Sequence, residues 1–195
     1  MNPPIQNRMR FLLRSLLRGD DASQIVEFAL SLPLLVVFTI GIFDFSGAYT
    51  LKQKLGNAAR DCARSVAGAP AGDVGTVALP AAVFDGKDVV ANYLENSKVN
   101  DCGLRTAAAP AASGLTWTYT ATGNGCPGSG LTLIINRGCV FPAANPGNVN
   151  VVGTCVQLQY TYQWQFNRVI ALVSPGASYA SFSTLNATAV AMNEN

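Results

Sequence analysis

The sequence contains no histidine and few charged residues. Its 195 residues include 13 Lys and Arg and 11 Asp and Glu, so charged residues make up 12% of the chain, about half the usual share. The absence of histidine excludes Ser-His-Asp and Cys-His nucleophile systems and His-ligated metal sites. The scarcity of Lys and Arg argues against a nucleic-acid-binding protein, because phosphate binding needs a dense basic face.

Carboxylates are missing from a long part of the chain, since none lies between Cys102 and Asn193. That stretch can build neither a catalytic carboxylate pair nor a charged site for a hard cation. We therefore expect a protein that is not an enzyme, with no catalytic residue, metal, cofactor or small-molecule substrate.

Hydrophobic residues are plentiful, at 49% of the chain, and they include an uncharged run of 16 residues over Phe28–Phe43. Widened to Ile25–Phe45, the segment takes in Glu27 and Asp44 near its two ends, and as a helix it spans about 31 Å, enough for a hydrocarbon core of about 30 Å. We expect a retained membrane anchor. A cleaved secretory signal and a buried core helix are the alternatives, but the run is longer than a signal's apolar region and the rest of the chain is polar and rich in glycine.

The orientation of this anchor follows from the cysteines. Basic residues are balanced across it, with Arg8, Arg10, Arg14 and Arg18 before it and Lys52, Lys54, Arg60 and Arg64 after it, so the positive-inside count is a tie. Four of the five cysteines lie in the C-terminal domain without zinc-site spacing, which is typical of disulfides in an oxidising compartment. We expect 1–22 to be a cytoplasmic basic leader and 68–195 an exported domain.

The apolar helix is expected to continue beyond the membrane. One helical face is formed by apolar residues at steps of three and four, namely Leu51, Leu55, Ala58, Cys62 and Val66. We predict one helix over 23–67, from Ser23 to about Val66, with a transmembrane half, an amphipathic half and a kink at Pro33.

After this helix the hydrophobic period changes. A second helix is predicted over Lys87–Asn96, with Asp85 as its cap. Period-two alternation and apolar runs then predict four strands of an antiparallel sheet, at Leu115–Ala121, Leu131–Asn136, Cys155–Phe166 and Tyr179–Met192. The expected fold class is α+β, a long N-terminal helix packed on a small antiparallel sheet.

The third of these strands carries alternating aromatic residues, among them Tyr160, Tyr162 and Trp164. Such a row could be a stacking platform for sugars or bases. Packing of the rings beneath a helix is the favoured interpretation.

The five cysteines leave at least one thiol unpaired. Cys62 lies on the apolar helix face and is expected to be a buried free thiol. The other four permit three pairings. We favour Cys139–Cys155, because these residues follow one predicted strand and begin the next, and this choice leaves Cys102–Cys126.

The N-terminal third of the chain carries a run of distinctive features. Glu27-Phe28 opens the apolar run, Leu32-Pro33-Leu34-Leu35 lies within it, and Phe43-Asp44-Phe45 leads to Tyr49 and on to Asn57-Ala58-Ala59-Arg60. Over about residues 20–67 the chain resembles the TadE-like minor pilins or pseudopilins of tight-adherence (Flp-type) pilus machines, relatives of type IV pilins.

The resemblance implies a pilin-like fold, a bacterial inner-membrane location and a set of partners: other pilins or pseudopilins, the pilus assembly platform and a prepilin peptidase. In the family the peptidase cuts just before the apolar helix, and a cut between Ala22 and Ser23 would make Glu27 the fifth mature residue. Pilin-type sites usually have glycine where this chain has Ala22, and a cut after Gly19 would make Glu27 the eighth. Glu27 and Phe28 are the residues expected to act in subunit pairing, with a neighbour's free α-amino group as the cation for Glu27.

Two functions are therefore expected as alternatives. In the first, the protein is an assembly subunit that is held in the inner membrane and then joins or primes a pilus. In the second, it is a single-pass, membrane-tethered periplasmic scaffold or binding module that does not polymerise, which the alanine at position 22 favours slightly. The mature N-terminal residue distinguishes them, because Ser23 supports the first and an intact residue-1 end supports the second.

Overall fold

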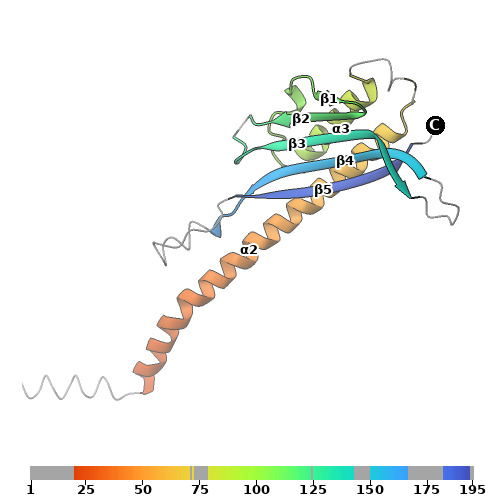
Figure 1. The fold of residues 1–195 in the computed structure, drawn as a ribbon. Coiled ribbons are helices and arrows are strands. Elements are labelled where there is room, and N and C mark those ends of the chain that lie inside the picture. The colour runs from red at the N-terminus through yellow and green to blue at the C-terminus, as the bar shows by residue number, and fades with distance from the viewer. Residues whose placement is uncertain are drawn as a thin grey trace, which may run out of the picture.

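The structure, a computed structural model, describes residues 20–70, 72, 79–123, 125–142, 150–166 and 182–193. In this part of the chain a long helix and a shorter one lie on the same face of a five-stranded antiparallel sheet (Figure 1). The predicted α+β class, with a long N-terminal helix on a small antiparallel sheet, is confirmed. The basic leader predicted over 1–22 falls almost entirely outside the described residues.

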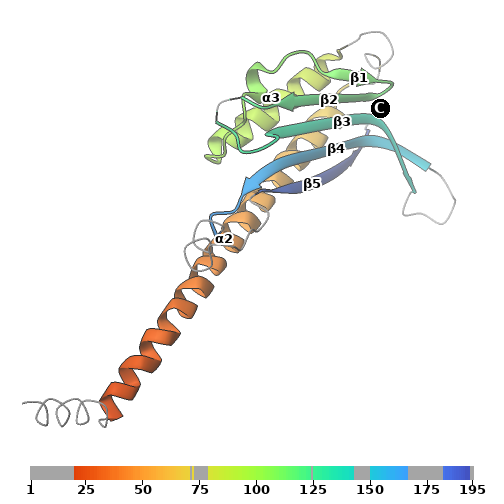
Figure 2. The same ribbon diagram turned by 60° about the vertical axis from the view of Figure 1, so that its left-hand side comes forward.

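The long helix, α2, runs over Asp20–Ala67 and contains the whole predicted helix. Its C-terminal half buries the predicted face, because Leu55, Ala58, Cys62 and Val66 are fully buried. Its N-terminal half projects away from the sheet (Figures 1 and 2). The helix continues through Pro33, and the kink predicted there stays a prediction.

The second helix, α3, covers Ala81–Asn96 and begins six residues before the predicted Lys87. Asp85 lies inside it, so the prediction that Asp85 caps the helix was wrong. The apolar stripe begins earlier than expected, with the buried pair Ala82 and Val83. Pro80 precedes the first turn, where its fixed backbone angle favours a helix start.

The sheet is a meander in which each strand pairs antiparallel with the next along the chain. Its strands are β1 Ala111–Ser113, β2 Thr116–Ala121, β3 Leu131–Pro142, β4 Asn150–Gln163 and β5 Phe182–Met192. The four predicted strands are present with shifted ends, and β3 extends past a register shift between Asn136 and Cys139. β1 was not predicted, because its three exposed residues carry no alternating pattern.

The hydrophobic core lies between the helices and the sheet. Figure 2 shows α3 and the C-terminal half of α2 side by side behind the strands. Trp117, Leu133 and Leu158 contribute from the sheet, and Val90 and Leu94 from α3. The core therefore fixes the direction in which the rest of α2 projects.

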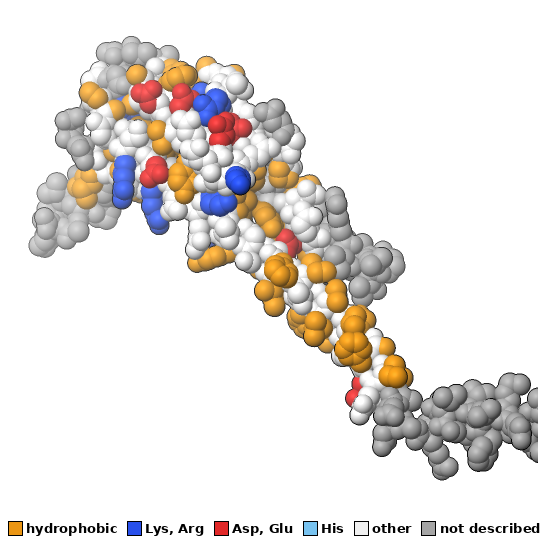
Figure 3. Space-filling model, turned by 180° about the vertical axis from the view of Figure 1, so that it is seen from behind, with side chains coloured by type: hydrophobic (Ala, Val, Ile, Leu, Met, Phe, Trp, Pro, Cys, Tyr) orange, Lys and Arg blue, Asp and Glu red, His pale blue; other side chains and the backbone are white. Residues whose placement is uncertain are grey.

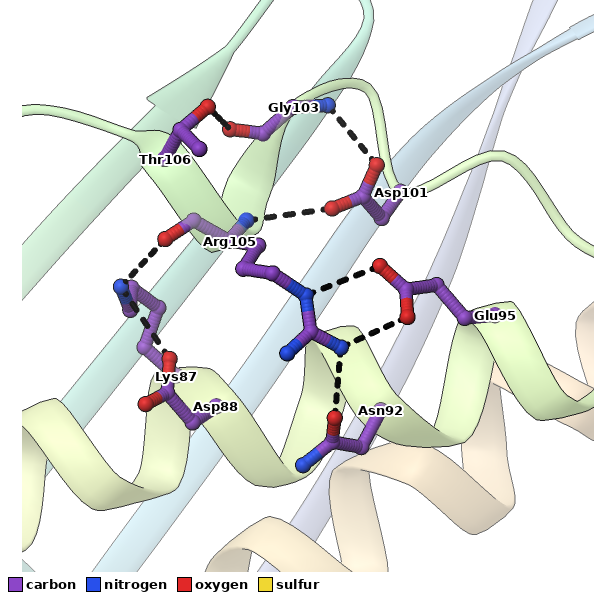
Figure 4. Close-up of polar contacts among 8 residues, drawn as sticks. All are labelled: Lys87, Asp88, Asn92, Glu95, Asp101, Gly103, Arg105 and Thr106. Carbon is purple, nitrogen blue, oxygen red and sulfur yellow. Dashed lines mark hydrogen bonds and ion pairs between the residues drawn. The ribbon is translucent and has the colours of Figure 1, made fainter.

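A polar cluster joins α3 to the short 3-10 helix η2, Leu104–Thr106 (Figure 4). The Lys87 ammonium is buried, donates to the Arg105 carbonyl oxygen at 2.8 Å and lies 3.2 Å from an Asp88 carboxylate oxygen. The Arg105 guanidinium donates to both Glu95 carboxylate oxygens, at 2.9 and 2.6 Å. This cluster holds the segment around Cys102 against α3, and we assign it a structural role.

Candidate membrane anchor and assembly surface

The N-terminal half of α2 exposes apolar side chains on all sides. Figure 3 shows them as a hydrophobic stalk below the charged globular part. The stalk is long and apolar enough to cross a membrane, and no residue of its most apolar stretch is buried. Its large exposed side chains include Ile25, Phe28, Leu30, Leu34, Leu35, Phe38, Ile42 and Phe43. The alternative of a buried core helix is therefore wrong for the monomer, and the exposure is compatible with a membrane anchor.

Glu27 lies near the free end of this stalk, in an exposed position of α2. Among the described residues no ion pair is formed by Glu27. Two hydroxyl groups of the stalk, in contrast, are satisfied within the helix, because Ser31 donates to the Phe28 carbonyl and Thr39 to the Leu35 carbonyl. A carboxylate at the edge of a bilayer is costly unless it is paired. The described part of this chain supplies no such ion-pair partner for Glu27.

Asp44 lies at the other end of the apolar run and is buried. Its carboxylate accepts a hydrogen bond from the Tyr162 hydroxyl at 2.8 Å and another from the Phe166 backbone N–H at 2.8 Å. Burial and the bond to Asp44 raise the pKa of Tyr162 to about 12. The sequence places Asp44 near one end of the apolar segment but does not reveal these partners, because nothing local in the sequence pairs residues so far apart.

The aromatic residues at and just after the end of β4 pack against α2. The Trp164 ring lies 5.2 Å from the Phe45 ring and 5.0 Å from the Tyr162 ring, and its indole N–H donates to the Ser183 hydroxyl at 2.6 Å. Tyr160, two residues before Tyr162 along β4, is buried in the core. The rings therefore pack beneath a helix, as favoured from the sequence, instead of forming a free stacking platform.

Two disulfides join parts of the domain that follows α2. Cys102 is bonded to Cys126 and Cys139 to Cys155, with Cα atoms 5.4 and 6.0 Å apart. These are the two pairings that the sequence favoured. Cys62 is a free thiol packed in the core, and burial raises its pKa to about 12.

The C-terminal half of α2 keeps one polar face open to solvent. Lys52, Asn57 and Arg60 line an open groove beside Asn186 and Thr188 of β5. In the residues that the structure describes, no three His, Cys, Asp or Glu side chains come together as metal ligands. The feature that stands out is instead the exposed stalk, with an acid at each end.

Residues 22–64 match the family model of TadE-like proteins. The resemblance noted in the sequence is confirmed for this segment, which covers the apolar half of α2 and most of its amphipathic half. The match to this family suggests an involvement in tight-adherence pilus systems. The sheet lies outside the match, and neither the curated proteins nor the solved structures gave a match to the chain.

Proposed function

We propose that this protein is a membrane-anchored minor pilin or pseudopilin that takes part in the assembly of a tight-adherence pilus. The observation that carries the proposal is the exposed apolar stalk of α2, with Glu27 near its start, inside the segment that matches TadE-like proteins. The other half of the same helix packs into the core of a folded domain. One helix thus offers a membrane or subunit contact at one end and a rigid attachment at the other.

The proposed topology places the N-terminal leader in the cytoplasm and the domain over 68–195 on the periplasmic side of a bacterial inner membrane. The two disulfides support this direction, because such bonds persist in oxidising compartments. The domain would cover the outside of the helix, and its contribution would be packing and recognition.

Assembly would use the stalk and Glu27. In an assembled array the stalk would leave the lipid and pack against neighbouring stalks, where an exposed carboxylate needs a cation. The α-amino group of a neighbouring subunit, released by a peptidase cut between Ala22 and Ser23, would supply it. The partners in this proposal are other pilins or pseudopilins, the assembly platform and a prepilin peptidase.

A periplasmic tether that never polymerises is the second candidate. The residue before the expected cut, Ala22, favours it because pilin-type sites usually carry glycine there. In that case Glu27 would stay at the membrane surface without a partner.

The mature N-terminus decides between the two. Intact mass and N-terminal sequencing should be measured on protein from the membrane fraction and from sheared surface filaments. We expect an N-terminal Ser23 and recovery of the protein in the sheared fraction, with Ala22→Gly also cut. Protein that keeps residue 1 and occurs in the membrane alone would establish the tether instead.

A further inference from the structure

We propose that the end of β4 and the start of β5 form a second membrane contact, which sits in the lipid headgroup region beside α2. The contact surface, here termed the aromatic collar, consists of Phe45, Tyr49, Trp164, Phe166 and Phe182. The proposal rests on anchoring by α2 and adds a lipid-binding role for the folded domain.

The level of the collar along α2 is the first argument. The Phe166 ring lies 3.9 Å from the position that a Cβ on Gly41 would take, and Gly41 lies inside the uncharged run Phe28–Phe43. The Phe166 backbone N–H also donates a hydrogen bond to the carboxylate of Asp44, which lies about one helical turn after Gly41. A bilayer that covers this run therefore has its surface at the end of β4. Figures 1 and 2 show this end of the sheet beside the middle of α2, with the C-terminus at the far end.

The chemistry of the collar suits that level. Phe45, Tyr49 and Phe182 are 69%, 65% and 42% exposed. Tyr and Trp rings gather at the membrane–water interface, where the ring body is dry and its polar edge is wet, and the Phe rings add apolar area. The Trp164 indole N–H already has its acceptor in Ser183.

Among the described residues, the acid at this level is Asp44. Its carboxylate is buried and accepts two hydrogen bonds from β4 and the residues just after it. A carboxylate with its bonds satisfied by protein does not need bulk water. Lys52, two turns farther from the apolar run, is exposed and can reach lipid phosphates along its flexible stem.

Lipid is favoured as the occupant because the collar is continuous with the stalk. The exposed rings of Phe43 and Phe45 belong to the same helix segment, so a bilayer that surrounds one reaches the other. A neighbouring subunit is the competing occupant, and the experiment separates it.

Tryptophan fluorescence offers a direct test, since the chain has two tryptophans. Trp117 is buried in the core, whereas Trp164 belongs to the collar. The full chain should be reconstituted as monomers in phosphatidylcholine–phosphatidylglycerol vesicles with bromine either near the headgroups or deep in the tails. We expect shallow bromine to quench wild-type protein roughly twofold more strongly than Trp164→Phe, and deep bromine to quench the two alike, as for a ring at the interface.

A matched pair on β5 keeps the test independent of Trp164. Phe182 and Val190 are both exposed on one face of this strand, about 27 Å apart at strand spacing. In the Trp164→Phe background, Phe182→Trp should be quenched by shallow bromine and Val190→Trp should not.

Flotation of the same vesicles tests anchoring by α2 separately from the lipid contact of the collar. Protein that does not float with lipid would overturn anchoring itself. Protein that floats, but whose collar positions are quenched no more than Trp117 or Val190→Trp, would overturn the lipid contact alone. The third outcome combines two results: collar positions are not quenched in monomers, and they crosslink between subunits at high protein density. That outcome would assign the surface to a neighbouring subunit.

Discussion

The Tyr162 hydroxyl donates a hydrogen bond to the Asp44 carboxylate across 2.8 Å, although the two residues lie 118 positions apart in the chain. The Phe166 N–H occupies the other carboxylate oxygen. Asp44 stands at the end of the apolar run and Tyr162 near the end of β4. The bond therefore joins the domain to the helix at the C-terminal end of the proposed anchor.

Removal of the Tyr162 hydroxyl should weaken this joint. Tyr162→Phe deletes one hydrogen bond to a charged, buried acceptor, so we expect a loss of about 1–3 kcal/mol in the free energy of unfolding. Denaturant titration of the full chain in detergent would measure it. Tyr49→Phe is the control, because Tyr49 is 65% exposed on the same helix. Equal stability of the two variants would contradict a structural role for the bond.

Alkaline pH should destabilise the fold. The pKa of Tyr162 is raised to about 12 by burial and Asp44, that of Tyr119 to about 12 chiefly by burial, and that of Cys62 to about 12 by burial. The folded state thus holds these protons more tightly than the unfolded state, whose values are about 10 for Tyr and 8.5 for Cys. The resulting stability is fully present below about pH 8.5 and is lost as the pH rises toward 12.

Denaturation midpoints measured across this range would check the pH dependence. The decline should begin with Cys62 and steepen as the tyrosines titrate, and Tyr162→Phe should show a shallower decline than wild type. A midpoint that stays constant up to pH 12 would contradict the raised pKa values.

The elements with strong local periodicity could be predicted from the sequence. The predicted positions Leu55, Ala58, Cys62 and Val66 of α2 are fully buried and recur at helical spacing. Val156, Leu158 and Tyr160 alternate along β4 as expected of a half-buried strand. Each of these patterns is complete within one segment, which is why it needs no knowledge of the rest of the fold.

Features that depend on distant partners could not be predicted. β1 is a three-residue edge strand defined by its pairing with β2. The early start of α3 depends on the fit of its first turns against α2, and the bonds of Asp44 depend on where β4 ends. In each case the deciding contact joins segments that no sequence spacing relates.

The close approach of α3 to α2 predicts opposite effects for two glycines. A Cβ on Gly86 would lie 2.5 Å from a Val66 methyl group and 3.2 Å from the Cys62 sulfur, so Gly86→Ala should cost about 1–3 kcal/mol through overpacking. Gly56, in the interior of α2, has open space at its Cβ position, and Gly56→Ala should stabilise by about 0.5–1 kcal/mol. Thermal unfolding of both variants measures this contrast, which a loosely packed helix pair would not show.

The disulfides and the free thiol predict a specific labelling pattern. Non-reducing peptide mapping of protein from the membrane fraction should find Cys102 linked to Cys126 and Cys139 to Cys155, and a thiol reagent should modify Cys62 in denaturant alone. Loss of either bridge should cost about 3 kcal/mol in the chain-entropy model. Four free thiols after Cys62 would contradict both the pairings and the proposed periplasmic orientation.

Glu27 provides the sharpest test of the assembly role. Glu27→Ala removes a charge from the proposed bilayer edge, so insertion should improve or stay equal, and the folded domain is far from the site. We therefore expect normal amounts of membrane-bound protein with both disulfides formed, together with a strong loss of surface pili. Asp61→Asn is the matched control, because Asp61 is also an exposed acid of α2 within the family-matched segment. It should leave piliation unchanged. Piliation by Glu27→Ala at the wild-type level would exclude subunit pairing through Glu27, and equal losses in both variants would assign the effect to charge on α2 in general.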